Sequence, residues 1–88
     1  MSALNLGTLN IRPDTKYEVY RNASRDAVTV TLTLADLQTA FTVHYGSATT
    51  TLEHSGAVTV NVPASSSITL SHGDANVMQP VKVQLAVA

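Results

Sequence analysis

The feature that most constrains this chain is the segment 27–34, in which apolar and hydroxyl side chains alternate strictly from residue 28 onwards. Successive side chains of a β-strand point to opposite faces of the sheet, so residues two apart share a face. In this segment the even-numbered positions are valine or leucine, and positions 29, 31 and 33 are threonine. One face is therefore apolar and the other polar, which predicts a half-buried β-strand.

The same alternation recurs along the chain between short segments rich in Gly, Pro, Ser, Asn and Asp. Further strands are predicted at residues 17–21, 41–45, 49–53, 58–62, 68–70 and 81–87. About seven strands at intervals near 8–12 residues are typical of an antiparallel β-sandwich. No segment combines helical apolar spacing with capping residues, so no helix of consequence is expected. The chain has no Trp and no Cys pair, so it is immunoglobulin-like only in the loose sense.

A length of 88 residues allows one domain, and a hydrophobic content of 44% can supply its core. We predict a single sandwich over residues 16–88, preceded by an extended N-terminal arm over residues 1–15. The apolar strand faces supply the predicted core, which comprises Val28, Val30, Leu32, Phe41, Val43, Val58, Val60, Val62, Ile68, Leu70, Val83 and Leu85.

The composition argues against several classes of function. The net charge is -1 and no cluster of Lys or Arg is present, so we expect no nucleic-acid binding. The absence of Cys excludes disulfides and thiolate catalysis, and it favours a cytosolic product or one stabilised by assembly. The N-terminal residues lack the pattern of a signal peptide, and no apolar run approaches the ~20 residues that span a bilayer. We therefore expect neither secretion nor membrane insertion.

The N-terminal arm carries the clearest candidates for contact with a partner. Leu4 and Leu6 are two residues apart, as are Leu9 and Ile11, so each half of the arm can form an edge strand. Chain termini are ordered only where something holds them. Two arrangements therefore stay open: the arm packs on its own domain as a first strand, or it reaches a neighbouring subunit.

Side chains suited to catalysis or metal binding are scattered singly along the chain. His44 is predicted on the outer face of its strand, and His54 and His72 in turns, with no metal-ligand spacing among them. We interpret all three as surface residues. Asn22 begins an Asn-Ala-Ser glycosylation pattern, but without a secretion signal we expect its side chain to bond nearby backbone in a turn. No catalytic residue, metal or cofactor is predicted, and the expected function is non-enzymatic.

The tyrosines support a second hypothesis. Tyr17 and Tyr20 are predicted on opposite faces of one strand, so at most one of them is buried with the core. If Tyr17 or Tyr45 stacked on a sugar ring, the chain would be a carbohydrate-binding or accessory β-sandwich module.

The chain resembles small structural proteins of tailed bacteriophages, in particular decoration (cement) proteins and head-fibre bases. The resemblance rests on the charge-poor sandwich pattern, on residues 20–24 leading into 27–34, and on residues 56–64 with their Val-Asn-Val-Pro-Ala segment. Similar segments occur in β-sandwich modules attached to glycoside hydrolases, which keeps the carbohydrate-binding alternative open.

The phage resemblance implies a non-enzymatic virion protein that clamps and stabilises a capsid lattice. Its partner would be the major capsid protein or another virion protein. It would reside in the virion, or in the host cytoplasm before assembly, as a homo-oligomer such as a trimer. The arm and edge strands would bind the partner through Leu4, Leu6, Leu9 and Ile11, with Tyr20 as a further contact.

Overall fold

The structure is a computed structural model that describes residues 2–73 and 78–87. The described residues form eight β-strands and no helix. The strands are β1 (Ser2–Ile11), β2 (Tyr17–Arg21), β3 (Val28–Ala35), β4 (Phe41–Tyr45), β5 (Ala48–Leu52), β6 (Gly56–Val62), β7 (Ser67–Ser71) and β8 (Gln79–Val87). The all-β prediction is confirmed. The structure has eight strands rather than about seven, because residues 2–11 also form a strand.

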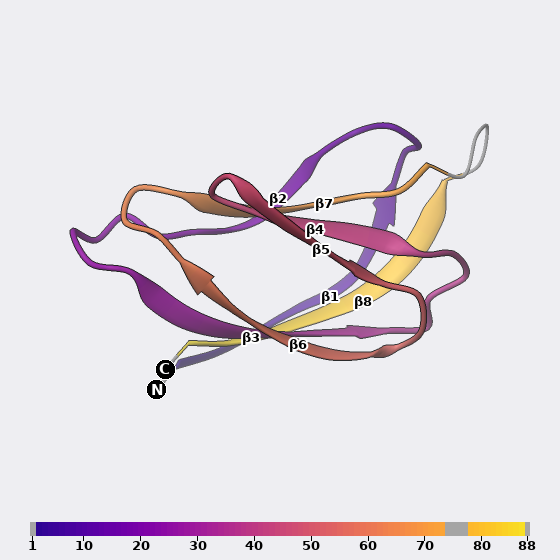
Figure 1. The fold of residues 1–88 in the computed structure, drawn as a ribbon. Helices are drawn as coiled ribbons and strands as arrows, with labels where there is room; N and C mark the ends of the chain where they lie inside the picture. The colour runs from indigo at the N-terminus through magenta and orange to yellow at the C-terminus, as the bar shows by residue number, and fades with distance from the viewer. Residues whose placement is uncertain (1, 74–77, 88) are drawn as a thin grey trace.

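The strands form two four-stranded antiparallel sheets that lie one above the other (Figure 1). One sheet has the order β1-β8-β3-β6 and the other the order β2-β7-β4-β5. The pairing is nested along the chain around the β4–β5 turn, because the first strand pairs with the last and each following strand pairs with the one before it at the other end. β1 thus pairs with β8, β2 with β7, β3 with β6 and β4 with β5. This nested pairing is the connectivity of a jelly roll, a double-sheet fold of eight strands. In the immunoglobulin order the first two strands are neighbours in one sheet, so the loose immunoglobulin-like expectation does not extend to the connectivity.

The core lies between the two sheets and consists of the apolar faces of the strands. In β3 the predicted alternation is confirmed, because Val30, Leu32 and Leu34 are fully buried and the threonines lie on the other face. The other predicted core residues are also buried, except for Val28 and Val58, which are half-buried and pack against the same core.

The segment predicted as an N-terminal arm is the outer strand of the first sheet in this structure. β1 pairs with β8 from one end to the other. A β-bulge at Leu6 inserts one extra residue, and Gly7 beside it takes a left-handed backbone with a φ of 69°. The bulge shifts the alternation by one position, so Leu4 and Leu9 each lie opposite a buried residue of β8.

A second bulge lies at Val19 in β2. The prediction that Tyr17 and Tyr20 point to opposite faces is wrong, because the extra residue between them changes the phase of the strand. Both tyrosines lie opposite buried residues of β7, and Val19 itself is buried. Tyr20 packs against the core, whereas Tyr17, the first residue of β2, is 43% exposed.

Candidate functional site

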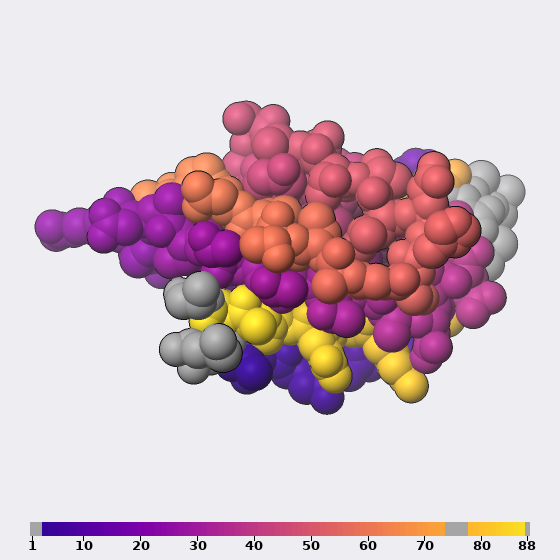
Figure 2. All heavy atoms as spheres, turned by 60° about the horizontal axis from the view of Figure 1, so that its bottom comes forward, coloured from indigo at the N-terminus to yellow at the C-terminus, as the bar shows by residue number. Residues whose placement is uncertain are grey.

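The described fold has four edge strands, β1, β6, β2 and β5, and β1 is the longest of them and carries two exposed leucines. β8 occupies one side of β1, and no described strand lies on the other side. Figure 2 shows β1 along the border of the molecule beside β8. Proteins usually blunt such an edge with charged residues, proline or a bulge. The segment Ser2–Ile11 contains no charge and no proline, so the bulge at Leu6 is its main protection.

The structure divides the four aliphatic residues that the sequence predicted as partner-binding anchors. Leu4 and Leu6 are 46% and 36% exposed and lie beside the free edge. Leu9 is half-buried and packs against the core. Ile11 is 1% exposed and belongs to the core, so a partner cannot reach its side chain while the domain is folded.

A shallow depression of about 300 Å³ adjoins the exposed half of β1. It extends from β1 across β8 to β3, and none of its lining residues is charged: Ala3, Leu4, Asn5, Thr31, Thr33, Gln84, Leu85 and Ala86. Leu4 therefore borders this uncharged surface as well as the unpaired strand edge, whereas Leu6 lies beside the edge without lining the depression. Tyr20 does not belong to this surface, because it lies in the second sheet and is half-buried.

The prediction that His72 is a surface residue is wrong. Its side chain is 3% exposed, and its ring lies 5.3 Å from the ring of Phe41, measured between centroids. Its Nε2 lies 2.7 Å from the carbonyl oxygen of Ile11 and must donate the hydrogen, because a carbonyl oxygen only accepts. The sequence held the signal for this burial, since residue 72 continues the buried alternation of Ile68 and Leu70.

The predictions for the other two histidines are confirmed. His54 is exposed in the connection between β5 and β6. His44 lies on the outer face of β4, where its Nε2 is 2.7 Å from the hydroxyl oxygen of Ser71. Burial lowers the pKa of His44, and the positive charge of Lys16 lowers it further.

Asn22 bonds to nearby backbone, as predicted, and it also reaches a distant turn. Its Oδ1 accepts hydrogen bonds from the amide and hydroxyl of Ser24, and its Nδ2 donates to the carbonyl of Asp26. The same Nδ2 lies 3.1 Å from the carbonyl oxygen of Val62 and 3.2 Å from that of Pro63. With 2% exposure, the side chain is enclosed and is not a glycosylation acceptor in the folded domain.

The described residues contain no group of three or more His, Asp or Glu side chains that could hold a metal ion. They also contain no helix of the length and apolar character needed to cross a membrane. No family model, no curated protein sequence and no solved structure matches the chain.

Proposed function

We propose that this protein is a non-enzymatic binding protein that joins a protein assembly through the free edge of β1. The assembly we propose is the capsid lattice of a virus, by analogy with the phage decoration proteins that the sequence resembles. The observation that carries the proposal is a ten-residue uncharged edge strand with Leu4 and Leu6 exposed beside it. Jelly-roll connectivity also occurs in viral capsid domains, which is an analogy at the level of fold alone.

The proposed mechanism is strand addition. An extended segment of the partner pairs with the unpaired backbone groups of β1, and its side chains cover the exposed parts of Leu4 and Leu6. Segment 2–11 would thus bind as an ordered strand and not as an extended arm. Complete burial of a leucine contributes about 1.5–3 kcal/mol, and these two are already partly covered, so together they contribute about 2 kcal/mol.

An apolar contribution of that size gives weak binding on its own. Stable attachment then requires the same contact to be repeated, because linked contacts raise the overall affinity without any new kind of interaction. A homo-oligomer such as a trimer, bound to a repeating lattice, satisfies this requirement. The modest apolar surface of β1 is therefore better suited to a lattice than to a single soluble partner.

The test replaces both exposed leucines by lysine, Leu4→Lys with Leu6→Lys. Deletion of residues 1–12 is unsuitable, because it would remove Ile11 from the core together with the acceptor of the His72 hydrogen bond. A matched control adds two lysines at exposed positions of β6, the opposite edge of the same sheet, with Ala57→Lys and Asn61→Lys. Binding is measured by co-sedimentation with assembled shells of a tailed-phage major capsid protein, and solution mass by sedimentation velocity.

We expect the unmodified protein to self-associate and to sediment with the shells. The β1 variant should lose at least about ten-fold in shell binding, roughly the 1.4 kcal/mol that corresponds to one decade, and keep its circular dichroism spectrum. The β6 variant should bind like the unmodified protein. The proposal is wrong if the β1 variant binds normally, if both variants lose binding equally, or if the unmodified protein is monomeric and binds no shell.

A further inference from the structure

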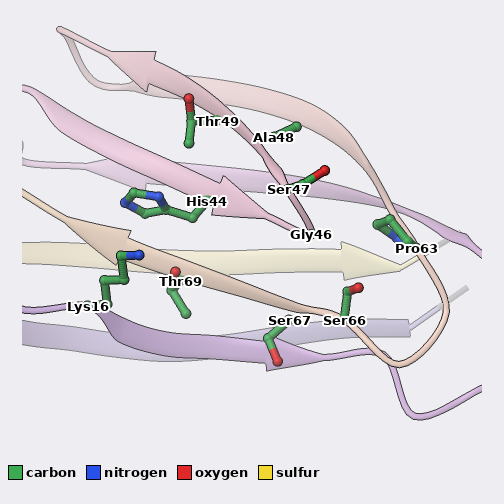
Figure 3. Close-up of a pocket in the computed structure, with 10 residues that line it drawn as sticks. All are labelled: Lys16, His44, Gly46, Ser47, Ala48, Thr49, Pro63, Ser66, Ser67 and Thr69. Carbon is green, nitrogen blue, oxygen red and sulfur yellow. The ribbon is translucent and has the colours of Figure 1, made fainter.

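The second sheet, which does not contain β1, carries a groove on its outer face. The groove has a volume of about 750 Å³, within the range of small-molecule sites. Figure 3 shows its two ends: Lys16, His44 and Thr69 lie at one, and Ser66 and Pro63 at the other. The groove therefore follows β7 and β4 towards the β6–β7 and β4–β5 turns.

Five of the ten residues that line the groove carry a hydroxyl group. They come from three separate parts of the chain: Ser47 and Thr49 at the β4–β5 hairpin, Ser66 at the β6–β7 turn, and Ser67 and Thr69 on β7. A hydroxyl both donates and accepts hydrogen bonds, as the hydroxyls of a sugar do. Among the described residues, no carboxylate lines the groove, and the only ring besides Pro63 is the imidazole of His44.

The positive charge of the groove is the ammonium group of Lys16, which lies at one end. Lys82–Asp36 is the only ion pair within the described ranges 2–73 and 78–87, so no described carboxylate lies within 4 Å of the Lys16 ammonium. Glu18 is the cross-strand partner of Thr69 and lies beside the groove without lining it. A ligand with one anionic group at that end would meet an ammonium that has not already been neutralised.

The other end of the groove is held in a fixed shape. Gly46 has a φ of 62°, and a Cβ on it would lie 3.0 Å from Cγ of Pro63, so glycine allows the two turns to approach closely. The Ser66 amide donates to the carbonyl of Pro63 at 3.1 Å, and the Asn22 amide donates to the carbonyl of Ser66 at 2.8 Å. A site that is ordered before binding loses less conformational entropy when the ligand arrives.

We infer that this groove binds an acidic oligosaccharide, with its serine and threonine hydroxyls bonded to sugar hydroxyls and the Lys16 ammonium facing a sugar carboxylate or sulfate. A peptide fits these features less well. The groove lies on a sheet face, where the backbone groups of β4 and β7 are already paired, so no strand can be added there. This inference is independent of the proposed function, because it involves the other sheet.

The experiment titrates the full-length protein with the trisaccharide of galacturonic acid and follows its amide signals by NMR. Three further titrations separate the sources of binding: the methyl ester of the same trisaccharide, inorganic sulfate, and a hexaglutamate peptide. The variants are Lys16→Gln, Thr69→Val and Glu18→Gln. Lys82→Gln serves as the matched control, because it removes the same charge from an exposed site on the first sheet.

We expect saturable millimolar binding of the acidic trisaccharide, with the largest shifts at residues 44, 47, 66, 67 and 69. Lys16→Gln should weaken binding about five-fold, as the loss of one exposed charge contact of about 1 kcal/mol implies. Thr69→Val should weaken it as well, Glu18→Gln should tighten it, and Lys82→Gln should leave it unchanged.

Three results would overturn the inference. The first is the absence of saturable binding to the trisaccharide. The second is binding of sulfate or hexaglutamate as tight as that of the trisaccharide, which would mean that charge alone, or a peptide, is recognised. The third is equal weakening by Lys16→Gln and Lys82→Gln, which would place the effect outside the groove.

Discussion

Replacement of Asn22 by alanine tests whether one side chain joins two distant turns of the fold. Asn22 lies in the connection between β2 and β3, and its Nδ2 reaches the carbonyl oxygens of Val62 and Pro63, 40 and 41 residues further along the chain. Its Oδ1 holds the amide and the hydroxyl of Ser24. Alanine removes every one of these bonds and creates no clash, because it is smaller than asparagine.

The expected cost follows from the number of bonds and from the burial of their partners. A typical hydrogen bond contributes about 1 kcal/mol net, and a buried acceptor left without a donor costs about 1–3 kcal/mol. Asn22→Ala should therefore lower the free energy of unfolding by about 3–4 kcal/mol. A domain of this size has a total stability of about 4–13 kcal/mol, so the melting temperature should fall by about 20 °C.

Urea unfolding followed by far-UV circular dichroism measures this loss, with Ser24→Ala as the matched control. The Ser24 hydroxyl bonds only within the same turn, to Oδ1 of Asn22 and the carbonyl of Asp26, so its loss should cost about 1 kcal/mol or less. Asn22→Asp keeps an acceptor but removes both donor hydrogens, so it should destabilise at least as much as alanine. A cost below about 1 kcal/mol for Asn22→Ala would refute the reasoning, because it would mean that water replaces these bonds without loss.

Two further predictions concern the second sheet. Gly46→Ala should lower the free energy of unfolding by about 2 kcal/mol, because the backbone of residue 46 is left-handed and the new Cβ meets the Pro63 ring. Urea unfolding measures this loss, with Gly56→Ala as the control, because a Cβ at residue 56 meets only a carbonyl oxygen at 4.0 Å. Equal losses of stability in the two variants would contradict the prediction. His44 has a folded-state pKa below the usual 6.5, so the unfolded chain takes up the proton first as the pH falls, and stability should decrease below about pH 6.5. His44→Gln should flatten this part of the pH profile measured by urea unfolding, and an unchanged slope would assign the effect to other groups.

Local alternation was sufficient to predict the strands but not their phase. The strands at 17–21 and 41–45 begin and end at the predicted residues, because alternation and turn residues are both local signals. The bulges at Leu6 and Val19 are different, since each depends on how the strand pairs with a neighbour from the far end of the chain. A shift of one residue reverses the face of everything beyond it, which is why the relative orientation of Tyr17 and Tyr20 was predicted wrongly.

The candidate sites show the same limit. Leu4 and Leu6 were predicted as anchors from their spacing, and the spacing of Leu9 and Ile11 is the same. What separates the two pairs is packing against the core, which no local pattern encodes. Likewise, no local pattern in the sequence connects Lys16, His44 and Thr69. The pairing of β4 with β5 and β7 brings them to one groove.

The scarcity of charge links these two surfaces. The chain has only five Lys and Arg residues and six Asp and Glu residues, so most of its polar surface consists of hydroxyls and amides. Such a surface repels other molecules weakly, which leaves the β1 edge open to strand addition from a partner. It also means that each charge near the groove, such as the ammonium of Lys16 or the carboxylate of Glu18, supplies a large share of the local potential, because few other charges are present. Replacing one charge in the groove should therefore change ligand selectivity more on this protein than on a surface of ordinary charge density.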